Sequence, residues 1–531
     1  MKMHLGGAMA AAVLAAGAAA AGDLADYVDP FIGTADHGHT FPGACMPFGM
    51  VQLSPDNGVD GWDWCSGYHR STNVIAGFSH THLSGTGCFD LSDISVMPTI
   101  KELNDAMFKP GPKHVQALVS EFSHDSESAS PGYYRVRLAD DGIDVELTAA
   151  RRAGFHRYTF PDGKARKVVF DLGFRINGDN PVDTGIRKIA PDTLAGWRHS
   201  KGWTPFQRVY FVAQFSEPVG DLKTWCGAPG ADGAVTGKVV KAAAIFPAGS
   251  KQLAMRVGIS SVSIEGAMAN LAAEPPPSGF DTVRAAARKA WNDELARITV
   301  ETPSDDLKKI FYTAMYHSFI FPGAFSDVDG RYKGYKDTVV KAEGFTKMHV
   351  LSLWDTFRAL MPLVAMVNPQ VTSDTINSML HQYQQTGQLP IWELAGDETM
   401  CMIGYHSIPV ICEAWFKGIG GFDKALAYEA MKAAANHDIR GLPMYRSMGY
   451  IPCDKEKESI SKLVEYCYDD WCIAQVAKSL GRDDDYKEFM RRSRNYRNVF
   501  DAKTGFLRGK KADGTWLEPF DPKFSAHGEH V

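Results

Sequence analysis

Apolar and polar residues alternate along the first half of the chain, which is the pattern of strands with one buried face. Four segments show it most clearly, at residues 133–138, 143–147, 154–160 and 167–172. Turn-forming runs separate them, such as Pro-Asp-Gly at 161–163, and no helical spacing intervenes. Many successive strands without helices predict an antiparallel β-sandwich, and we expect this domain to occupy residues 22–274.

The pattern changes after the proline-rich run at 275–279, which we interpret as the boundary between two domains. A helical segment follows at 280–296. Its apolar residues Val283, Ala287, Trp291 and Leu295 fall on one stripe. Residues 275–304 are therefore predicted to form a helical linker.

From residue 305 onward the apolar residues keep helical spacing. Seven helices are predicted, at 306–318, 352–367, 372–385, 407–417, 423–436, 459–480 and 483–500. Helix pairs joined by loops rich in glycine, aspartate and aromatic residues are typical of an α/α toroid. A closed toroid of six helical hairpins needs about twelve helices of ordinary length. We therefore predict an incomplete (α/α)6 barrel over residues 305–531, truncated at the chain end.

Residues 1–21 have the features of a secretory signal peptide. Lys2 precedes an alanine-rich apolar run, and Ala19-Ala20-Ala21 offers a small-residue cleavage site. A membrane anchor is the alternative, but the run is short and weakly apolar. No later stretch of the sequence is apolar enough to span a bilayer. We predict an exported protein, periplasmic or extracellular, with no membrane contact beyond the signal peptide.

Charge and cysteine content narrow the classes of partner and site. The net charge is −6, and lysines and arginines are scattered without a basic stripe, so no nucleic-acid partner is expected. The nine cysteines form no CxxC pair, which argues against a zinc ribbon. Export permits disulfides, and Cys453 could pair with Cys467 or Cys472. Several buried thiols would explain the same sequence.

Residues 27–98 carry the densest chemical signal, because glycines and prolines there fix turns between histidine and tryptophan side chains. A rigid surface of this kind suits a ring-shaped, hydroxylated ligand. The His-X-His pairs at 37–39 and 80–82 would chelate a metal or form structural hydrogen bonds. Trp62 and Trp64 share a face if extended, for sugar stacking or for core packing.

The run Trp-Asp-Thr-Phe-Arg at 354–358 stands at the start of a predicted helix. Asp355 and Arg358 are three residues apart and share a helix face. Beside Trp354 they supply an acceptor, a fork of donors and an apolar surface, which is what a sugar ring requires. A structural salt bridge that caps the helix is the alternative.

A second polar run, at 388–399, places Glu393, Asp397 and Glu398 in one loop. Glycosidases use paired carboxylates, one as an acid and one as a base or nucleophile, so this loop is a candidate site. Acidic residues also favour a helix N-terminus through the helix dipole, which would give them a purely structural role.

Several of these runs, in this order, resemble glycoside hydrolase family 92. They are VDPFIGT at 28–34, HGHTFPG at 37–43, PFGM at 47–50, GFSHTHLSGTG at 77–87, WDTFR at 354–358 and GDETMCMIGYH at 396–406. The resemblance covers essentially all of the chain after the signal peptide. It implies an exo-acting, calcium-dependent α-mannosidase that inverts the anomeric centre and releases mannose from N-glycans or mannans. It also implies a β-sandwich joined by helices to an (α/α)6 barrel.

The family's motifs for the general acid, the general base and the calcium ligands have no match before Val531. We therefore assign no catalytic or metal-binding residue in this chain. The resemblance implies that these groups lie beyond its end, and that this N-terminal portion is inactive alone. The three carboxylates at 393–398 are interpreted as wall or structural residues.

Four residues are predicted to contact an α-mannoside glycan, namely Trp64, Trp354, Asp355 and Arg358. The histidines at 80 and 82 are expected to order the domain interface. Two other functions remain open. One is a carbohydrate-binding protein without catalysis. The other is a different (α/α)6-barrel glycosidase or phosphorylase, which would need a carboxylate pair within this chain, with Glu398 as the candidate.

Overall fold

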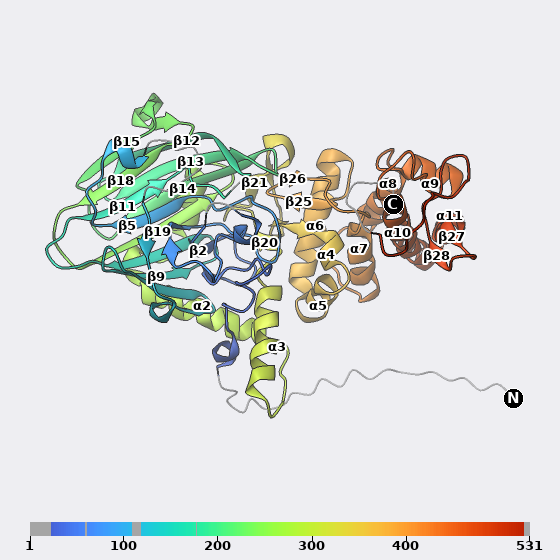
Figure 1. The fold of residues 1–531 in the computed structure, drawn as a ribbon, viewed down its shortest axis with the longest axis horizontal. Helices are drawn as coiled ribbons and strands as arrows, with labels where there is room; N and C mark the ends of the chain where they lie inside the picture. Colours follow the sequence, from blue (N-terminus) through green and yellow to red (C-terminus); the bar gives the residue numbers. More distant parts are fainter. Residues whose placement is uncertain (1–22, 59–60, 109–117, 177, 525–531) are drawn as a thin grey trace.

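The computed structural model describes residues 23–58, 61–108, 118–176 and 178–524. A β-rich half is followed by a helical half, and the two lie side by side along the long axis of the molecule (Figure 1). The predicted order of a β-rich domain and then a helical domain is thus confirmed. The predicted signal peptide at 1–21 lies outside the described residues.

Two antiparallel sheets build the β-rich half. One sheet has the order β1 (Ala44–Cys45), β2 (Gln52–Asp56), β4 (Gly77–Ser79), β5 (Ser95–Thr99), β11 (Arg166–Asp171), β18 (Lys241–Phe246), β15 (Asp221–Trp225). The other has the order β16 (Ala228–Pro229), β17 (Val235–Gly237), β12 (Asn180–Ala190), β13 (Thr193–Lys201), β14 (Gln207–Phe215), β19 (Gln252–Ser260), β10 (Ala153–Thr159), β9 (Ile143–Ala149), β8 (Tyr133–Leu138), β7 (Ser128–Ser130).

The predicted alternation is visible in the burial of single strands. Along β8, Tyr134, Val136 and Leu138 are buried while Arg135 and Arg137 between them face solvent. Phe170 of β11 stacks on Phe211 of β14 with ring centres 5.7 Å apart, so the two sheets meet through their apolar faces. The four strands predicted from alternation are β8, β9, β10 and β11. Because these strands face one shared core, their apolar and polar residues alternate along the sequence.

Two helices cover the outer face of the larger sheet. α1 (Ile264–Ala272) packs on β14 and β19, and α2 (Phe280–Leu295) packs on β8 and β9. All four residues of the predicted apolar stripe on α2 are buried. The proline-rich run at 275–279 lies between these two helices, and its role as the domain boundary stays a prediction.

The helical half contains α3 (Asp305–Ser318), α4 (Leu353–Thr356), α5 (Leu360–Val367), α6 (Pro369–Thr386), α7 (Ser407–Phe416), α8 (Lys424–Asn436), α9 (Leu442–Met448), α10 (Ser459–Ser479) and α11 (Asp483–Arg492). The single helix predicted over 352–367 is wrong, because the chain breaks between α4 and α5. Pro362 has no N–H to donate to the carbonyl of Arg358, so a continuous helix cannot form there. The helix predicted over 483–500 ends at Arg492 and continues as a 3-10 turn, η8 (Asn495–Val499).

Short antiparallel pairs fill the connections. They are β3 (Val74–Ile75) with β6 (Ser120–Glu121), β20 (Gly323–Ala324) with β23 (Met348–His349), β21 (Arg331–Lys333) with β22 (Val339–Lys341), and β27 (Phe500–Asp501) with β28 (Phe506–Leu507). A three-stranded sheet joins β24 (Leu351–Ser352), β25 (Trp392–Leu394) and β26 (Asp397–Glu398). This small sheet brings the start of α4 next to the acidic loop.

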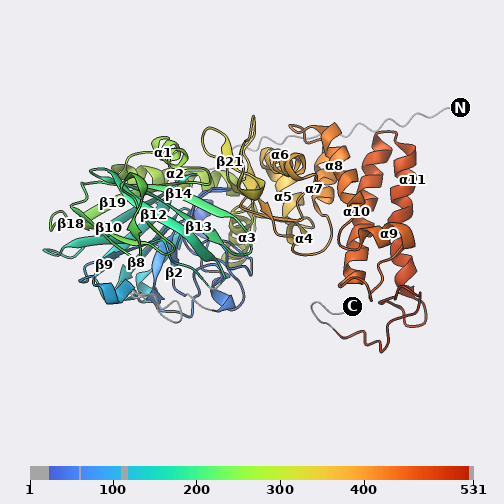
Figure 2. The same cartoon turned by 90° about the horizontal axis from the view of Figure 1, so that it is seen from above.

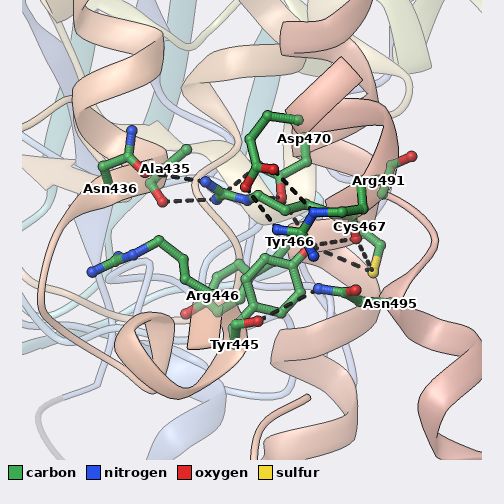
Figure 3. A network of polar contacts seen from close by, with 12 residues as sticks. Ala435, Asn436, Tyr445, Arg446, Tyr466, Cys467, Asp470, Arg491 and Asn495 are labelled. Atoms are coloured by element: carbon green, nitrogen blue, oxygen red, sulfur yellow. Dashed lines mark hydrogen bonds and ion pairs between the residues drawn. The ribbon is translucent and has the colours of Figure 1, made fainter. Parts of the chain in front are cut away.

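A buried ion pair fixes α10 against its neighbours (Figure 3). Asp470 accepts hydrogen bonds from Arg492 Nε at 2.8 Å and from the hydroxyls of Tyr405 and Tyr445, each also at 2.8 Å. Arg492 in turn donates to the carbonyl of Ala435 at 2.8 Å. Every charged group is therefore partnered, which a charge in an apolar interior requires. In Figure 2, α10 and α11 run alongside each other at the end of the molecule away from the sheets.

A third apolar cluster, here called the junction cluster, joins the two halves. It contains Phe41 and Leu83 from the β-rich half, Trp291 from α2, and Trp392 from β25. Trp203, in the loop after β13, contacts Trp392 with ring centres 4.7 Å apart. The loops of the glycine-rich N-terminal block thus lie against the loops of the helical half.

None of the nine cysteines forms a disulfide in this structure, and all nine are among the described residues. Of the two possibilities left open, a disulfide from Cys453 to Cys467 or Cys472 is absent and several buried thiols are present. Cys467 and Cys472 are instead buried in the packed side of α10. Within the described ranges, no helix combines the length and apolarity needed to cross a membrane.

Candidate functional site

Trp354 and Arg358 converge on a residue that the sequence did not single out, Glu465 of α10. Trp354 Nε1 donates to Glu465 Oε1 over 3.1 Å, and Arg358 Nη2 donates to the same oxygen over 3.2 Å. The Arg358 guanidinium carbon lies 4.5 Å from the ring centre of Phe357. One carboxylate therefore fixes both an indole and a guanidinium whose outer surface remains exposed.

Behind Glu465 the contacts continue into the protein. His406 Nε2 lies 3.3 Å from Glu465 Oε2, and His406 Nδ1 lies 2.8 Å from Asp469 Oδ1. Phe357 stacks on the His406 ring with centres 4.0 Å apart. Burial raises the pKa of Asp469, and its hydrogen bond with His406 opposes that rise. The exposed end of this chain of contacts is thus anchored in a buried carboxylate.

Asp355 points elsewhere. Its carboxylate accepts a hydrogen bond from Ser352 Oγ and is otherwise exposed. In the described part of the chain, no ion pair joins Asp355 to Arg358, so the structural salt bridge considered from their spacing is absent. Arg358 pairs with Glu465 instead, which leaves Asp355 as an accessible acceptor beside Trp354.

Of the two tryptophans in η2 (Trp62–Trp64), Trp64 is the more enclosed. Its Nε1 donates to Thr72 Oγ1 over 3.0 Å, and its ring lies 4.9 Å from that of His69. Trp62 is 49% exposed, and its Nε1 donates to the Gly87 carbonyl over 3.2 Å. A sugar that approached this loop would therefore meet Trp62 before Trp64.

Trp62 is flanked by the first histidine pair. The His39 ring meets it edge-on at 4.2 Å, and the His37 ring lies 5.2 Å away. His37 Nδ1 is 2.5 Å from Asp63 Oδ1, a contact that lowers the pKa of that carboxyl group. The loop presents an indole between two imidazoles, a surface suited to a hydroxylated ring.

The second histidine pair is buried and structural. His80 lies 3.0 Å from His156 through their Nε2 atoms, and His82 Nε2 lies 3.0 Å from Asp56 Oδ1. These polar contacts all lie within the β-rich half rather than between the halves. Among the residues that the structure describes, no three His, Cys, Asp or Glu side chains are grouped so that they could hold a metal ion.

The three carboxylates of the acidic loop are already engaged. Asp397 pairs with the Lys333 ammonium, and Glu393 Oε1 lies 3.5 Å from Lys347 Nζ. Glu398 accepts three backbone N–H groups at 2.7–3.0 Å. These contacts hold the loop in shape, in agreement with their interpretation as structural residues.

Sequence reasoning placed Trp354, Asp355 and Arg358 together but missed Glu465, His406 and Asp469. The i, i+4 spacing of Glu465 and Asp469 puts them on one face of α10. Nothing in the sequence states that this face meets residues more than 100 positions earlier. The one available signal was His406, which ends the run at 396–406.

Comparison with known proteins places the chain among glycosidases. Residues 27–260 match the glycosyl hydrolase family 92 N-terminal domain, and residues 266–530 match the family 92 catalytic domain. An uncharacterized secreted glycosidase of Arthroderma benhamiae is 27% identical over 550 residues, which is 95% of this chain and 66% of that protein.

Two solved structures extend the likeness to the fold. A family GH92 α-mannosidase from Bacteroides thetaiotaomicron, in complex with mannoimidazole, is 39% identical with a TM-score of 0.90, over 94% of this chain and 67% of that one. A GH92 inverting mannosidase from the same bacterium is 29% identical with a TM-score of 0.82, over 94% and 68%. This chain spans about two thirds of the length of these relatives. Its two halves match the two domains of one family in order, and the chain belongs to glycoside hydrolase family 92.

Proposed function

We propose that the protein is an α-mannosidase that releases mannose from α-mannoside glycans. The observation that carries this proposal is the 39% identity, with a TM-score of 0.90, to a GH92 α-mannosidase solved with mannoimidazole. The group around Trp354 supports it. Trp354 offers an apolar ring face, Asp355 an accessible acceptor and Arg358 a fork of donors, all within or just after α4.

We infer that the acid and the base come from other residues, expected beyond Val531. An inverting glycosidase needs two carboxyl groups about 6.5–9.5 Å apart with a water between them. The acidic-loop carboxylates are bound to lysines and backbone amides, so they offer no such pair. The match to the catalytic domain over 266–530 gives no support to the expectation that this chain is inactive alone, and the assay below decides it.

We further propose that the helical half is part of a larger (α/α)6 barrel. Phe416 of α7 is 56% exposed, and the stacked rings of Tyr468 and Trp471 on α10 are 43% and 44% exposed. Large exposed aromatic groups on neighbouring helices favour a surface that further helices cover.

Calcium dependence and secretion complete the proposal. Among the described residues no three His, Cys, Asp or Glu side chains are grouped around a possible ion, so a bound calcium ion would need carbonyl oxygens or further residues as ligands. Export is supported by the relative described as secreted.

The test compares this chain with a version extended along its open reading frame. Both are incubated with α-1,2- and α-1,3-mannobiose, with and without EDTA, and the anomer of released mannose is followed by NMR. We expect the extended protein to release the inverted β-anomer and to lose activity in EDTA. Turnover by this chain alone would overturn the placement of the acid and base. No release by either protein would overturn the proposed activity.

A further inference from the structure

A cavity of about 640 Å³ lies where the β-rich half meets α2 and α6. Its walls come from five parts of the chain, and the residues that give it chemical character are Phe48, Arg151, Glu294, Phe345, Gln370 and Asp374. Small-molecule sites in proteins commonly enclose about 300–1,000 Å³. The cavity is therefore large enough for a mono- or disaccharide.

This cavity is separate from the Trp354 group. Gln370 and Asp374 lie in the first turns of α6, whereas the acidic loop follows the other end of that helix. Ser352, just before α4, pairs with Trp392 in that loop, so the Trp354 group lies at the far end of α6. The 18 residues of α6 extend about 27 Å. None of the residues that line the cavity belongs to the group of Trp354, Asp355, Arg358 and Glu465.

Arg151 is a cation without a committed partner. Its Nη2 donates a long hydrogen bond to Thr346 Oγ1 over 3.4 Å. Within the described residues, no ion pair joins Arg151 to a carboxylate, although Asp374 also lines the cavity. The surrounding protein lowers the pKa of Arg151 by desolvation, and the nearby charge of Asp374 opposes this. The side chain is exposed, so most of its donors are accessible to a ligand in the cavity.

Asp374 is a matching acceptor. The residue is only 7% exposed, and Gln370 Nε2 donates to its Oδ1 over 2.9 Å. Glu294 is occupied by Arg297 and by Asn368 Nδ2 at 3.1 Å. Carboxylates therefore outnumber the single uncommitted guanidinium, which disfavours phosphates and other polyanions. Phe345 and Phe48 add apolar surface between these polar groups.

We propose that this cavity is a second, non-catalytic saccharide site, in which Arg151 donates to and Asp374 accepts from the hydroxyls of a neutral sugar. Hydroxyl groups both donate and accept, so one sugar satisfies the guanidinium and the carboxylate together. Phe345 supplies the apolar contact for the C–H face of the ring. The proposal does not depend on the proposed hydrolysis.

The test is calorimetric titration of the full chain with mannose and with α-1,2-mannobiose. Arg151→Ala and Asp374→Asn should each weaken binding at the cavity at least tenfold, while Arg358→Ala should leave it unchanged. Arg135→Ala, which removes an exposed arginine of the same half, is the matched control. Arg151→Lys serves if the alanine variant fails to fold, because it keeps the charge but loses the fork of donors.

Three results would overturn the proposal. These are unchanged sugar affinity in both Arg151 variants, loss of all sugar binding in Arg358→Ala, and absence of any sugar binding by the unmodified chain. The titration measures sugar binding and not hydrolysis. Its result can therefore be interpreted even if the mannose-release assay shows no activity. Cavity binding in a protein without turnover would separate the two proposals.

Discussion

At the scale of single residues, Glu465 joins two members of the predicted sugar-binding group, Trp354 and Arg358. Glu465→Ala removes the acceptor for both Trp354 and Arg358, so both side chains gain freedom. We expect kcat/KM for α-mannosides in the extended protein to fall about tenfold or more, which corresponds to about 1.4 kcal/mol. Glu465→Gln keeps one carbonyl acceptor but loses the charge. Its kcat/KM should therefore lie between those of the wild type and the alanine variant.

The matched control for Glu465 is Glu488→Ala. It removes an exposed glutamate paired with an arginine on α11, away from this group. Thermal unfolding of each variant separates lost positioning from lost stability. An alanine variant at 465 with unchanged stability and unchanged kcat/KM would contradict the role given to this carboxylate.

The two tryptophans of η2 should behave differently. Trp62→Ala removes a half-exposed ring and should weaken mannoside binding with little change in stability. Trp64→Ala removes a more enclosed ring and its hydrogen bond to Thr72, and should lower the free energy of unfolding by about 1–3 kcal/mol. Urea unfolding and ligand titration of both variants measure the two effects. The reverse outcome would return the sugar contact to Trp64.

At the scale of elements, a relay of hydrogen bonds ties β10 to the segment after β4. Tyr158 donates to His156 Nδ1 at 2.9 Å, His156 Nε2 lies 3.0 Å from His80 Nε2, and His80 Nδ1 donates to the Ile94 carbonyl at 2.7 Å. This arrangement needs both imidazoles neutral. Burial lowers the pKa of His80 to about 4 and holds that of His156 well below its usual value.

The relay makes a prediction about pH. An unfolded histidine has a pKa near 6.5, so between about pH 6.5 and 4 the unfolded chain binds protons that the folded relay excludes. This contribution to stability is present above pH 6.5 and is lost as pH falls, by up to about 1.4 kcal/mol per pH unit for each histidine. His156→Gln should therefore lose less stability than wild type between pH 7 and pH 5 in urea unfolding.

The comparison between proteins matters because other groups act in the opposite direction. Burial raises the pKa of Asp90 and Asp327 to about 6, and such carboxyl groups favour the folded state as pH falls. Their contribution is common to wild type and variant and cancels in the difference. An equal loss in the two proteins would contradict the relay.

At the scale of the whole molecule, the junction cluster links the stability of the two halves. Trp392 is 1% exposed and contacts Trp203 from the β-rich half. Trp392→Ala should lower the free energy of unfolding by about 3–5 kcal/mol. In calorimetry, the melting temperatures of both halves should fall. Trp415→Ala, a half-buried tryptophan of α7, should affect only the helical half. Melting of the β-rich half at its wild-type temperature in Trp392→Ala would contradict the link.

Much of the fold was predictable because local patterns report burial directly. The strands β8 to β11 and the apolar stripe on α2 each face one core. Their apolar residues therefore recur every two positions in the strands and about every 3.6 positions in the helix. The break between α4 and α5 could have been foreseen from Pro362. The short strands of the N-terminal block were harder to predict. Glycine, proline and histidine there are placed by turns and show no strand periodicity.

The candidate site likewise has a part that local sequence patterns predict and a part that they do not. The family, the β-rich and helical halves, and the local group Trp354, Asp355 and Arg358 could be predicted from the sequence, because they depend on residues close together in the chain. The pairing of Arg358 with Glu465 rather than Asp355 became known from the folded structure. So did the lysines that hold the acidic loop, and the cavity that both Arg151 and Asp374 line. These contacts depend on which faces of the helices and strands pack together. Residue spacing does not indicate which segments, distant in the sequence, pack against each other.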